Sequence, residues 1–431
     1  MEKLAYLGGP KAFPEPLQPH ITTDEKDIKS AMRVLKKGLL SGYEGTNNEL
    51  FMGGPEIQQF ESEWQDYFGV KHALAVNSAT SGLYCAIGAT GCGPGDEVII
   101  TPWTMSASAA AIIGYNAIPV FADIEPDTFN IDPASIRERL SDRTKAVMVV
   151  NLLGQSADMD PIMKIAQQHN LCVIEDAAQS IGAHYRGHFS GTIGHIGVFS
   201  LNCNKLIQSG EGGVVVTNDD ELAHRVSLIR NHAEAVIGTG MPVNSLINML
   251  GWNYRMTEVE AAISRVQLTK LEGLIAERRK LAEYFTKGIA SLDGLIPPVI
   301  RQDCTHVYYR YPIRFNRSRI PVNSREFTKV LNAEGLSFDT GFTPLYLQPL
   351  YQQKIVYGDK GCPFSCPFYG KEIDYSEGLC PVAERLERDA ITTEEIRPPL
   401  TISDIEKIVY AFRKVLHYGE QLPEIMKGKV Q

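Results

Sequence analysis

The sequence has little of what a membrane-spanning, secreted or nucleic-acid-binding protein needs. Residues 1–16 lack a basic start followed by an apolar run, so we expect no signal peptide. The uncharged stretch 98–122 is interrupted by prolines and a glycine, whereas a helix that crosses a membrane needs roughly 20 unbroken apolar residues. The formal net charge is −9, and no long run of lysine and arginine offsets it, which argues against nucleic acid and anionic membranes as partners. We therefore expect a cytoplasmic protein.

The cysteines do not follow a metal-binding pattern. Cys362, Cys366 and Cys380 come close together, but their spacing matches no common zinc site, and no histidine follows them before His417. We expect no metal site. In the absence of a secretion signal, we expect all eight thiols to be reduced.

The order of apolar segments predicts the fold class. Between residues 72 and 174, short apolar strands alternate with helical segments, and the expected strands are 72–76, 97–101, 118–124, 146–151 and 171–174. Fully apolar strands that alternate with helices are typical of a parallel sheet covered on both faces. We therefore predict an α/β protein with a mainly parallel central sheet and helices on both faces.

The pattern changes after residue 216. Residues 258–281 read as one helical stretch, residues 308–315 alternate like a strand, and a capping box of Ser403 and Glu406 predicts the start of the last helix. We predict a large α/β domain over residues 1–255, with an N-terminal arm at 1–35. A connecting helix would span residues 256–300, and a smaller α+β domain residues 301–431.

Two side chains near strand ends are candidates for chemistry, because ligands bind at the carboxyl ends of the strands in an open parallel sheet. Asp176 follows the strand 171–174, although such an acid can simply cap a helix. Lys205 is the only charged residue between residues 187 and 210, and its neighbours are mostly apolar. A buried, unpaired ammonium loses its proton, and a neutral amine is what a Schiff base requires. The alternative is a lysine whose charged end reaches solvent.

Other features add to this pair. The turn Asn77-Ser78-Ala79-Thr80 opens a helix after a strand, so its free N–H groups and hydroxyls can bind an anion or merely cap the helix. Trp103 follows another strand and can belong to the core or stack on a flat ring. Pyridoxal phosphate needs a lysine for its aldehyde, a carboxylate for its ring nitrogen, an anion site for its phosphate and a flat side chain against its ring.

These motifs, in this order, resemble the sugar aminotransferases of DegT/StrS type, a branch of the type I fold of pyridoxal-phosphate enzymes. The resemblance runs from Leu39 to about Leu416. The matching stretches are residues 77–83, 93–98, 173–180, Phe199-Ser200 with Lys205 and Gly210-Glu211-Gly212-Gly213, and residues 251–256.

The resemblance implies a role for each matched position. Lys205 would form the Schiff base with pyridoxal phosphate and then carry a proton, and Asp176 would keep the pyridine nitrogen protonated. Asn253 would reach a phosphate in the neighbouring subunit, which implies a homodimer with shared active sites. The other cofactor-binding residues would be Ser78, Ala79 and Thr80 with Ser200 at the phosphate, Gln179 at the phenolic oxygen and Trp103 against the ring.

The chain also departs from the family pattern. Ala79 stands where a glycine is usual, which is tolerable only if its φ is negative. Asn204 precedes the lysine where threonine is frequent. The segments 43–53 and 352–378 are longer than in many members, and we expect them to shape the substrate pocket.

The predicted activity is ping-pong transfer of an amino group from glutamate or glutamine to a keto-sugar, with a nucleotide-linked sugar preferred. A keto-cyclitol of scyllo-inosose type is the alternative, because Leu40-Ser41-Gly42-Tyr43 and residues 380–385 look more like enzymes that aminate inososes. A sugar deoxygenase of the same fold would carry histidine at Lys205, and a non-catalytic relative would not need an intact site. A nicotinamide dehydrogenase is disfavoured because the glycine string at residues 91–95 precedes a strand.

Overall fold

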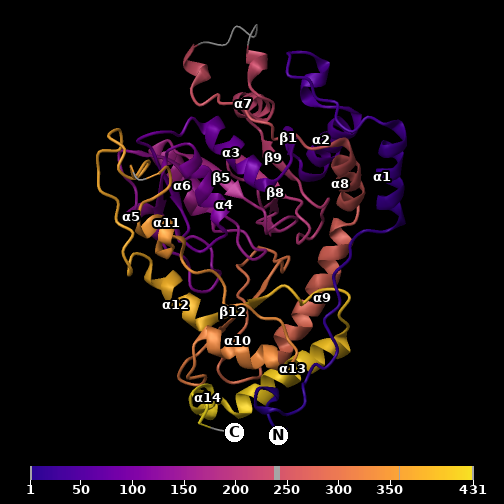
Figure 1. Ribbon diagram of the computed structural model, residues 1–431, viewed down its shortest axis with the longest axis vertical. Coiled ribbons are helices and arrows are strands. Elements are labelled where there is room, and N and C mark those ends of the chain that lie inside the picture. The colour runs from indigo at the N-terminus through magenta and orange to yellow at the C-terminus, as the bar shows by residue number, and fades with distance from the viewer. Residues whose placement is uncertain (1, 237–242, 359, 430–431) are drawn as a thin grey trace.

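The computed structural model describes residues 2–236, 243–358 and 360–429. Its larger unit is built on a seven-stranded sheet with the order β1-β9-β8-β5-β4-β2-β3 (Figure 1). Within this sheet β9 pairs antiparallel with both of its neighbours, and the remaining pairs are parallel. The predicted α/β class with a mainly parallel sheet is confirmed. The strands are β1 (His72–Val76), β2 (Glu97–Ile100), β3 (Ile118–Phe121), β4 (Thr144–Val150), β5 (Cys172–Asp176), β8 (Ile196–Ser200) and β9 (Gly213–Thr217).

Helices cover both faces of this sheet. In β4, Met148 and Val150 belong to one hydrophobic cluster, whereas Val147 and Val149 belong to another. The first cluster lies under α3 (Ala79–Thr90), α4 (Ser106–Gly114) and α7 (Asp220–Arg230), and the opposite face is covered by α2 (Pro55–Phe68), α5 (Pro133–Glu138), α6 (Met159–His169) and α8 (Glu258–Leu268). A Cβ on Gly82 of α3 would lie 2.8 Å from Val198 Cγ1, so glycine lets this helix approach the sheet closely.

The smaller unit, at the bottom of Figure 1, contains an antiparallel three-stranded sheet with the order β10-β11-β12. Its core also includes Leu4 and Phe13, so the N-terminal residues pack on this unit. The division at residues 255 and 300 stays a prediction. The elements are β10 (Leu295–Ile296), β11 (Tyr311–Phe315) and β12 (Ala390–Thr393), with α9 (Leu271–Ile289), α10 (Ser324–Ala333), α12 (Pro381–Asp389), α13 (Ile402–His417) and α14 (Leu422–Met426).

The remaining elements lie outside these two sheets. Helix α1 packs against α8, and the paired strands β6 and β7 form a short hairpin. None of the helices in the described parts of the chain is long and apolar enough to cross a membrane. These elements are α1 (Glu25–Lys37), α11 (Pro349–Gln352), β6 (His184–Tyr185) and β7 (His188–Phe189).

Three local predictions differ from the structure. The helical stretch 258–281 is two helices, α8 and α9, which are separated at Thr269 and Lys270. The strand predicted from residue 308 begins at Tyr311, because Tyr308 has a φ of +51°, which does not continue a strand. The capping box of α13 is Thr401 with Asp404, two residues before the predicted pair, because Thr401 is the last residue with extended backbone.

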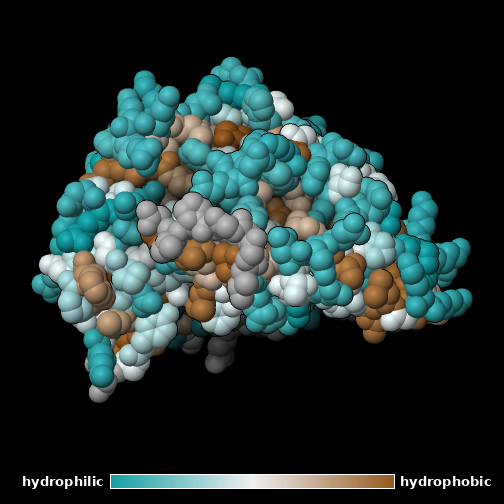
Figure 2. Space-filling view, turned by 90° about the horizontal axis from the view of Figure 1, so that it is seen from above, coloured by the Kyte–Doolittle hydropathy of each residue, from teal (hydrophilic) through white to brown (hydrophobic). Residues whose placement is uncertain are grey.

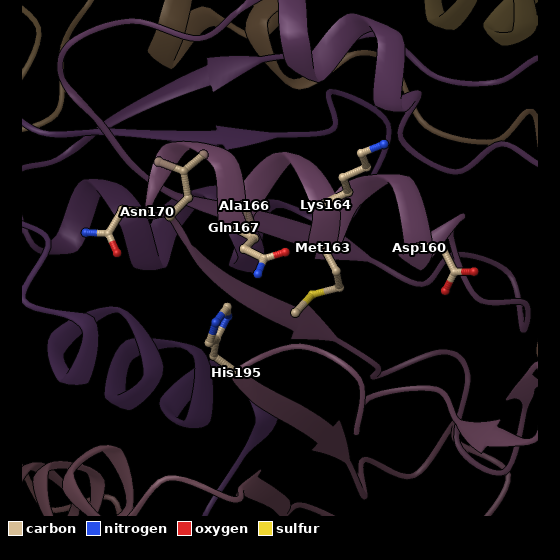
Figure 3. A pocket seen from close by; sticks show the side chains of 8 residues that line it. Asp160, Met163, Lys164, Ala166, Gln167, Asn170 and His195 are labelled. Atoms are coloured by element: carbon tan, nitrogen blue, oxygen red, sulfur yellow. The ribbon is translucent and has the colours of Figure 1, made fainter.

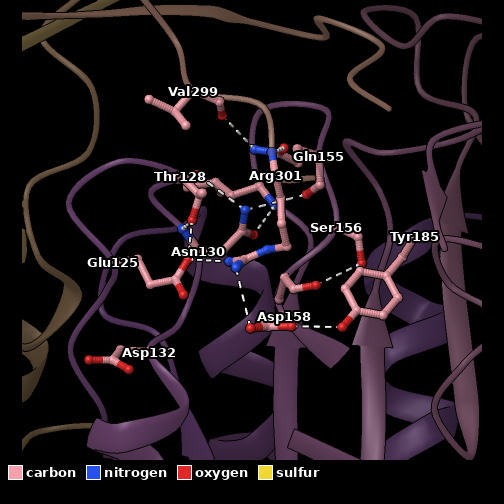
Figure 4. Close-up of polar contacts among 12 residues, drawn as sticks. Glu125, Thr128, Asn130, Asp132, Gln155, Ser156, Asp158, Tyr185, Val299 and Arg301 are labelled. Atoms are coloured by element: carbon pink, nitrogen blue, oxygen red, sulfur yellow. Dashed lines mark hydrogen bonds and ion pairs between the residues drawn. The ribbon is translucent and has the colours of Figure 1, made fainter. Parts of the chain in front are cut away.

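The loop between β10 and β11 of the smaller unit, residues 297–310 (the crossing segment), extends onto the larger unit and is held to the loops after β3 and β4 (Figure 4). Arg301 forms ion pairs with Glu125 and Asp158. The Gln155 side chain accepts a hydrogen bond from the Arg301 backbone N–H at 2.7 Å and donates one to the Val299 carbonyl at 3.1 Å. The crossing segment is therefore fixed in place on the larger unit.

A buried ion pair fastens the N-terminal segment to the smaller unit. Lys414 Nζ donates to Glu334 Oε2 at 2.8 Å, and both side chains are completely buried. The Glu334 carboxylate also accepts from the backbone N–H groups of Ala5 and Ala12. Removal of one partner would leave a buried charge without compensation.

We expect Lys414→Met to lower the free energy of unfolding by about 3–5 kcal/mol, because Glu334 would stay buried without its cation. Lys429→Met is the control, since Lys429 pairs with Glu424 on the exposed surface at 3.4 Å and should change stability by no more than about 1 kcal/mol. Urea denaturation followed by circular dichroism measures both. Equal effects of the two substitutions would contradict this interpretation.

Candidate active site

A cavity of about 310 Å³ lies at the carboxyl ends of β5 and β8, beside the start of α3. A pocket of this size is within the range of small-molecule sites. Seven of the predicted site residues line it: Ser78, Ala79, Thr80, Asp176, Gln179, Ser200 and Lys205. The cavity is also lined by Leu83, Thr104, Met105, Ala107, Ser108, Ala178, Asn202, Asn204, Glu211 and Tyr309.

Asp176 is the last residue of β5, the central strand of the sheet, and its side chain is almost completely buried. Ser108 Oγ of α4 donates to Asp176 Oδ2 at 2.8 Å, and the Ala178 backbone N–H donates to Oδ1 at 3.1 Å. Burial raises the pKa of Asp176, and these two hydrogen bonds and the charge of Lys205 oppose the rise. A carboxylate in this setting gains most from a cationic partner, such as a protonated ring nitrogen.

Lys205 lies in the loop after β8 and is half-buried. Its Nζ donates to Tyr309 Oη at 3.2 Å and lies 4.3 Å from the centre of the Tyr309 ring. The surroundings are more polar than the flanking sequence suggested, because its apolar neighbours point into the core and polar side chains remain at the mouth. The buried neighbours are Phe199, Leu201, Leu206 and Ile207, whereas Cys203, Asn204 and Glu211 are exposed.

The start of α3, where the sequence predicts an anion site or a simple helix cap, lies at the pocket. Ser78 is the N-cap, and its Oγ accepts from the Ser81 backbone N–H at 3.0 Å. Ala79 begins the helix and is not among the residues with positive φ, so its methyl group is tolerated. A Cβ on Gly213 would lie 2.7 Å from the Ala79 nitrogen, so this glycine lets β9 pass close beneath the first turn. The first N–H groups of a helix have no partner within the helix and attract anions.

The structure does not bring Trp103 into this pocket. Its indole is fully buried and stacks on Phe129, with ring centroids 5.1 Å apart and an interplanar angle of 15°. Met105, two residues later, lines the pocket instead, and its Sδ accepts from the Ala107 backbone N–H at 3.2 Å. The aromatic character of Trp103 suggested ring stacking, but the turn after β2 directs that side chain into the core.

Asn253 also lies outside the pocket of its own chain. It is exposed, and its Oδ1 accepts from Arg255 Nε at 3.0 Å. Its expected contact with a neighbouring subunit stays a prediction. Among the described residues, none of the segments 43–53 and 352–378 lines the pocket. Tyr43 packs over the buried Arg230, and the longer segment covers the edge of the sheet, where Tyr375 Oη donates to the Pro119 carbonyl at 2.7 Å.

The residues that form hydrogen bonds with the side chains of Asp176 and Lys205, Ser108 and Tyr309, were both missed in the sequence. Ser108 sits in an uncharged run of small side chains, where a serine gives no sign that it faces a carboxylate. Tyr309 was assigned to an alternating strand, and nothing local distinguishes it from Tyr308 or Tyr311. Both residues are brought to the pocket by long-range packing, from α4 and from the crossing segment.

A larger cavity, of about 630 Å³, lies elsewhere on the large unit (Figure 3). It is lined mainly by α6 together with His195, and it shares no residue with the pocket around Lys205. His195 is engaged in the fold, because its Nδ1 accepts from the Val173 backbone N–H at 2.9 Å. Size alone therefore does not identify the active site.

Comparison with known proteins agrees with this geometry. Residues 43–374 match the DegT/DnrJ/EryC1/StrS aminotransferase family. The chain belongs to this family. It is 40% identical over 301 residues to GDP-perosamine synthase of Caulobacter vibrioides, a match that covers 69% of this chain and 79% of that enzyme. It is 32% identical over 420 residues to L-glutamine:2-deoxy-scyllo-inosose aminotransferase of Streptomyces kanamyceticus, with 94% of each chain covered.

The solved structures give the same result. The crystal structure of DesI in the presence of its TDP-sugar product superposes with a TM-score of 0.82 at 27% identity, over 98% of this chain and 99% of that chain. The protein is thus a pyridoxal-phosphate-dependent aminotransferase of the sugar or cyclitol type. The pocket fits this cofactor, because it combines an amine, a desolvated carboxylate and the N-terminus of a helix.

The raised pKa of Asp176 predicts a pH-dependent effect on stability. A carboxyl group with a raised folded-state pKa binds more protons in the folded than in the unfolded protein, so its contribution to stability falls as the pH rises through that pKa. In the cofactor-free protein, the free energy of unfolding of Asp176→Asn relative to the wild type should therefore increase between acidic pH and neutrality. Denaturant titration at a series of pH values measures this difference.

The control substitution is Asp142→Asn. A hydrogen bond from Lys371 lowers the pKa of Asp142, so this exposed carboxylate contributes stability above its ordinary pKa and loses it as the pH falls. The relative stability of Asp142→Asn should change slightly in the opposite direction. A difference for Asp176→Asn that does not vary with pH would show that burial does not disfavour its charged form.

Proposed function

We propose that this enzyme transfers an amino group from glutamate or glutamine to the keto carbon of a nucleotide-linked sugar. The observation that carries the proposal is the meeting of the Lys205 amine and the buried Asp176 carboxylate in one cavity. When bound, pyridoxal phosphate supplies the electron sink that lets an amino group and a keto group be exchanged.

Each polar side chain of the pocket would have a separate role. Asp176 would hold a proton at the ring nitrogen of the cofactor, and the N-terminus of α3 with Ser200 would bind its phosphate. Gln179 Oε1 accepts from the Leu153 backbone N–H at 2.9 Å, which leaves the amide nitrogen free to donate to the cofactor. Lys205 would move the proton at the reacting carbon, and donor and acceptor would use the same pocket in turn.

The mouth of the pocket suits a hydroxyl-rich acceptor. Asn202, Asn204 and Glu211 offer amide and carboxylate groups, and Asn202 Nδ2 donates to Glu211 Oε1 at 3.1 Å. Such side chains can donate to and accept from sugar hydroxyls. The relatives named for GDP-perosamine synthesis and for a TDP-sugar product support a nucleotide-linked sugar over a free one.

A keto-cyclitol is the second candidate, and the inosose aminotransferase relative supports it because it matches almost the whole chain. The motifs that suggested it are structural, however. Cys380 is buried, and the backbone N–H groups of Val382 and Ala383 donate to the Asp123 carboxylate, which caps α12. The Leu40 carbonyl likewise accepts from the Glu258 backbone N–H. These motifs therefore favour neither acceptor.

A panel of acceptors tests the proposal. The cofactor-loaded enzyme would first receive glutamate or glutamine, and then a GDP-linked keto-sugar, a TDP-linked keto-sugar or scyllo-inosose. We expect an aminated product, detected by mass spectrometry, from a nucleotide-linked sugar and none from the inosose. The reverse result would favour the cyclitol reaction.

The substitution Lys205→Ala tests whether the Lys205 amine is needed for catalysis, with Lys164→Ala as its control. Loss of the proton carrier should lower the turnover rate by about 10²–10⁴-fold. Lys164→Ala, on α6 beside the larger cavity, removes a lysine that lies outside the pocket and should keep full activity. Full activity of Lys205→Ala would end the proposal.

We also propose that the active site is shared between two copies of the chain. Ile28, Met32 and Leu35 form an exposed apolar stripe along α1, and Trp252 is exposed beside Asn253. Figure 2, which looks onto the upper end of the molecule, shows hydrophobic surface between hydrophilic side chains. Apolar surface of this kind marks an interface. In such a dimer, Asn253 would reach the phosphate site of the partner subunit.

Mixing two inactive variants tests the shared site. If Asn253 acts in the partner subunit, a dimer of Lys205→Ala with Asn253→Ala contains one intact site and one doubly damaged site. Random reassociation should then restore about a quarter of wild-type activity. If Asn253 acts within its own chain, each mixed site keeps one defect, and no activity should return.

A further inference from the structure

Tyr309 contacts the reactive amine from the side of the crossing segment. Its hydroxyl accepts a hydrogen bond from Lys205 Nζ at 3.2 Å, and the same nitrogen lies 4.3 Å from the centre of its ring. The tyrosine side chain is buried and lines the cavity together with Asp176. Within the described residues, no other hydrogen bond of Lys205 Nζ is recorded, so Tyr309 is the polar group that fixes the position of this amine.

The backbone around Tyr309 is built to present it in this way. Tyr308 adopts a left-handed conformation with a φ of +51°, and its N–H donates to His306 Nδ1 at 2.8 Å. Burial lowers the pKa of His306 to about 3, so its imidazole stays neutral and Nδ1 stays an acceptor. The left-handed residue turns the chain so that consecutive tyrosines point in different directions. Tyr308 stacks on His306, whereas Tyr309 faces Lys205.

Two further contacts hold this turn from opposite sides. Arg278 of α9 is buried, and its Nη1 donates to the carbonyls of Tyr308 and Tyr309, at 3.1 Å each. On the other side, the Val307 N–H donates to the Gly154 carbonyl at 2.8 Å. A Cβ on Gly154 would lie 2.8 Å from the nitrogens of both tyrosines, so only glycine allows this approach. The Gln155 contacts of Figure 4 continue the same attachment.

These buried contacts fix the Tyr309 hydroxyl opposite the Lys205 amine. A hydroxyl acceptor and the face of an aromatic ring both attract the amine, and both limit the rotation of the long lysine side chain. The adjoining Leu153 N–H donates to Gln179 Oε1, so the same loop also orients a second side chain of the pocket.

We propose that Tyr309 is a positioning residue for Lys205. Whenever the lysine amine is free, the Tyr309 hydroxyl accepts its hydrogen bond and holds Nζ inside the pocket, where it can transfer a proton. This inference rests on the proposed role of Lys205. It adds that the smaller unit takes part in catalysis through this contact, because the crossing segment and α9 determine where Tyr309 lies.

The test uses Tyr309→Phe, which keeps the ring and removes the hydroxyl. The matched control is Tyr308→Phe, which removes a neighbouring hydroxyl from the same segment and should behave like the wild type. In the cofactor-loaded enzyme, the half-reaction with glutamate alone should slow by roughly ten-fold in Tyr309→Phe, with the apparent affinity for glutamate unchanged. Stopped-flow absorbance of the cofactor measures both quantities and needs no sugar acceptor.

A second measurement does not depend on activity. In the full chain without cofactor, cyanate modifies free amines, and the rate at Lys205 can be followed by peptide mass spectrometry. Release of the amine from the Tyr309 hydroxyl should raise this rate by about two- to ten-fold, while the rate at the exposed Lys71 stays constant. If Tyr309→Phe fails to fold, as judged by thermal unfolding, Tyr309→His is tested instead, because a ring nitrogen can replace the acceptor.

The outcomes separate this inference from the proposed function. An inactive Lys205→Ala together with a Tyr309→Phe that matches the wild type in both measurements would overturn the role of Tyr309 and leave the aminotransferase site intact. Equal defects in Tyr308→Phe and Tyr309→Phe would also overturn it, because they would indicate a general effect on packing. A fully active Lys205→Ala would instead reject the proposed function itself.

Discussion

The cost of holding the Asp176 carboxylate away from water is the constraint around which the pocket is built. An acid at the end of the central strand is tolerated because Ser108 and the Ala178 N–H donate to its two oxygens. Those bonds compensate desolvation only in part, and the pKa stays raised. A cationic ring nitrogen would complete the compensation, so the buried carboxylate favours a pyridinium cofactor.

The smaller unit contributes to this pocket through one short stretch of chain. Residues 306–310 pass over the loop after β4, where Gly154 allows close contact, and Arg278 holds them from the side of α9. The lysine lies in the loop after β8 of the large sheet, and its tyrosine partner lies in the crossing segment. A contact with the crossing segment therefore holds the Lys205 amine in place.

The side chains that would recognise the acceptor differ from those that would carry out the amino-group transfer. In the proposed reaction the cofactor would occupy the part of the pocket around Asp176, and polar side chains that include Asn202 and Glu211 would remain for a substrate. The segments 43–53 and 352–378, whose length suggested a role in specificity, instead pack on Arg230 and on the edge of the sheet.

The sequence alone determined the fold class, five of the seven strands of the large sheet and seven residues that line the pocket. Apolar runs, turns and caps are local, so strands such as β1 and β5 and the positions of Lys205 and Asp176 at strand ends could be read directly. The features that the sequence did not predict depend on the directions of side chains and on contacts between residues that are distant in the chain. Only the packing of the sheet, α4 and the crossing segment places Met105, and not Trp103, at the pocket. The same packing gives Lys205 its polar surroundings and brings Ser108 and Tyr309 to the pocket. The sequence pattern shows which side chains are apolar. Which side chains come into contact depends on burial and on backbone turns that lie far apart in the chain.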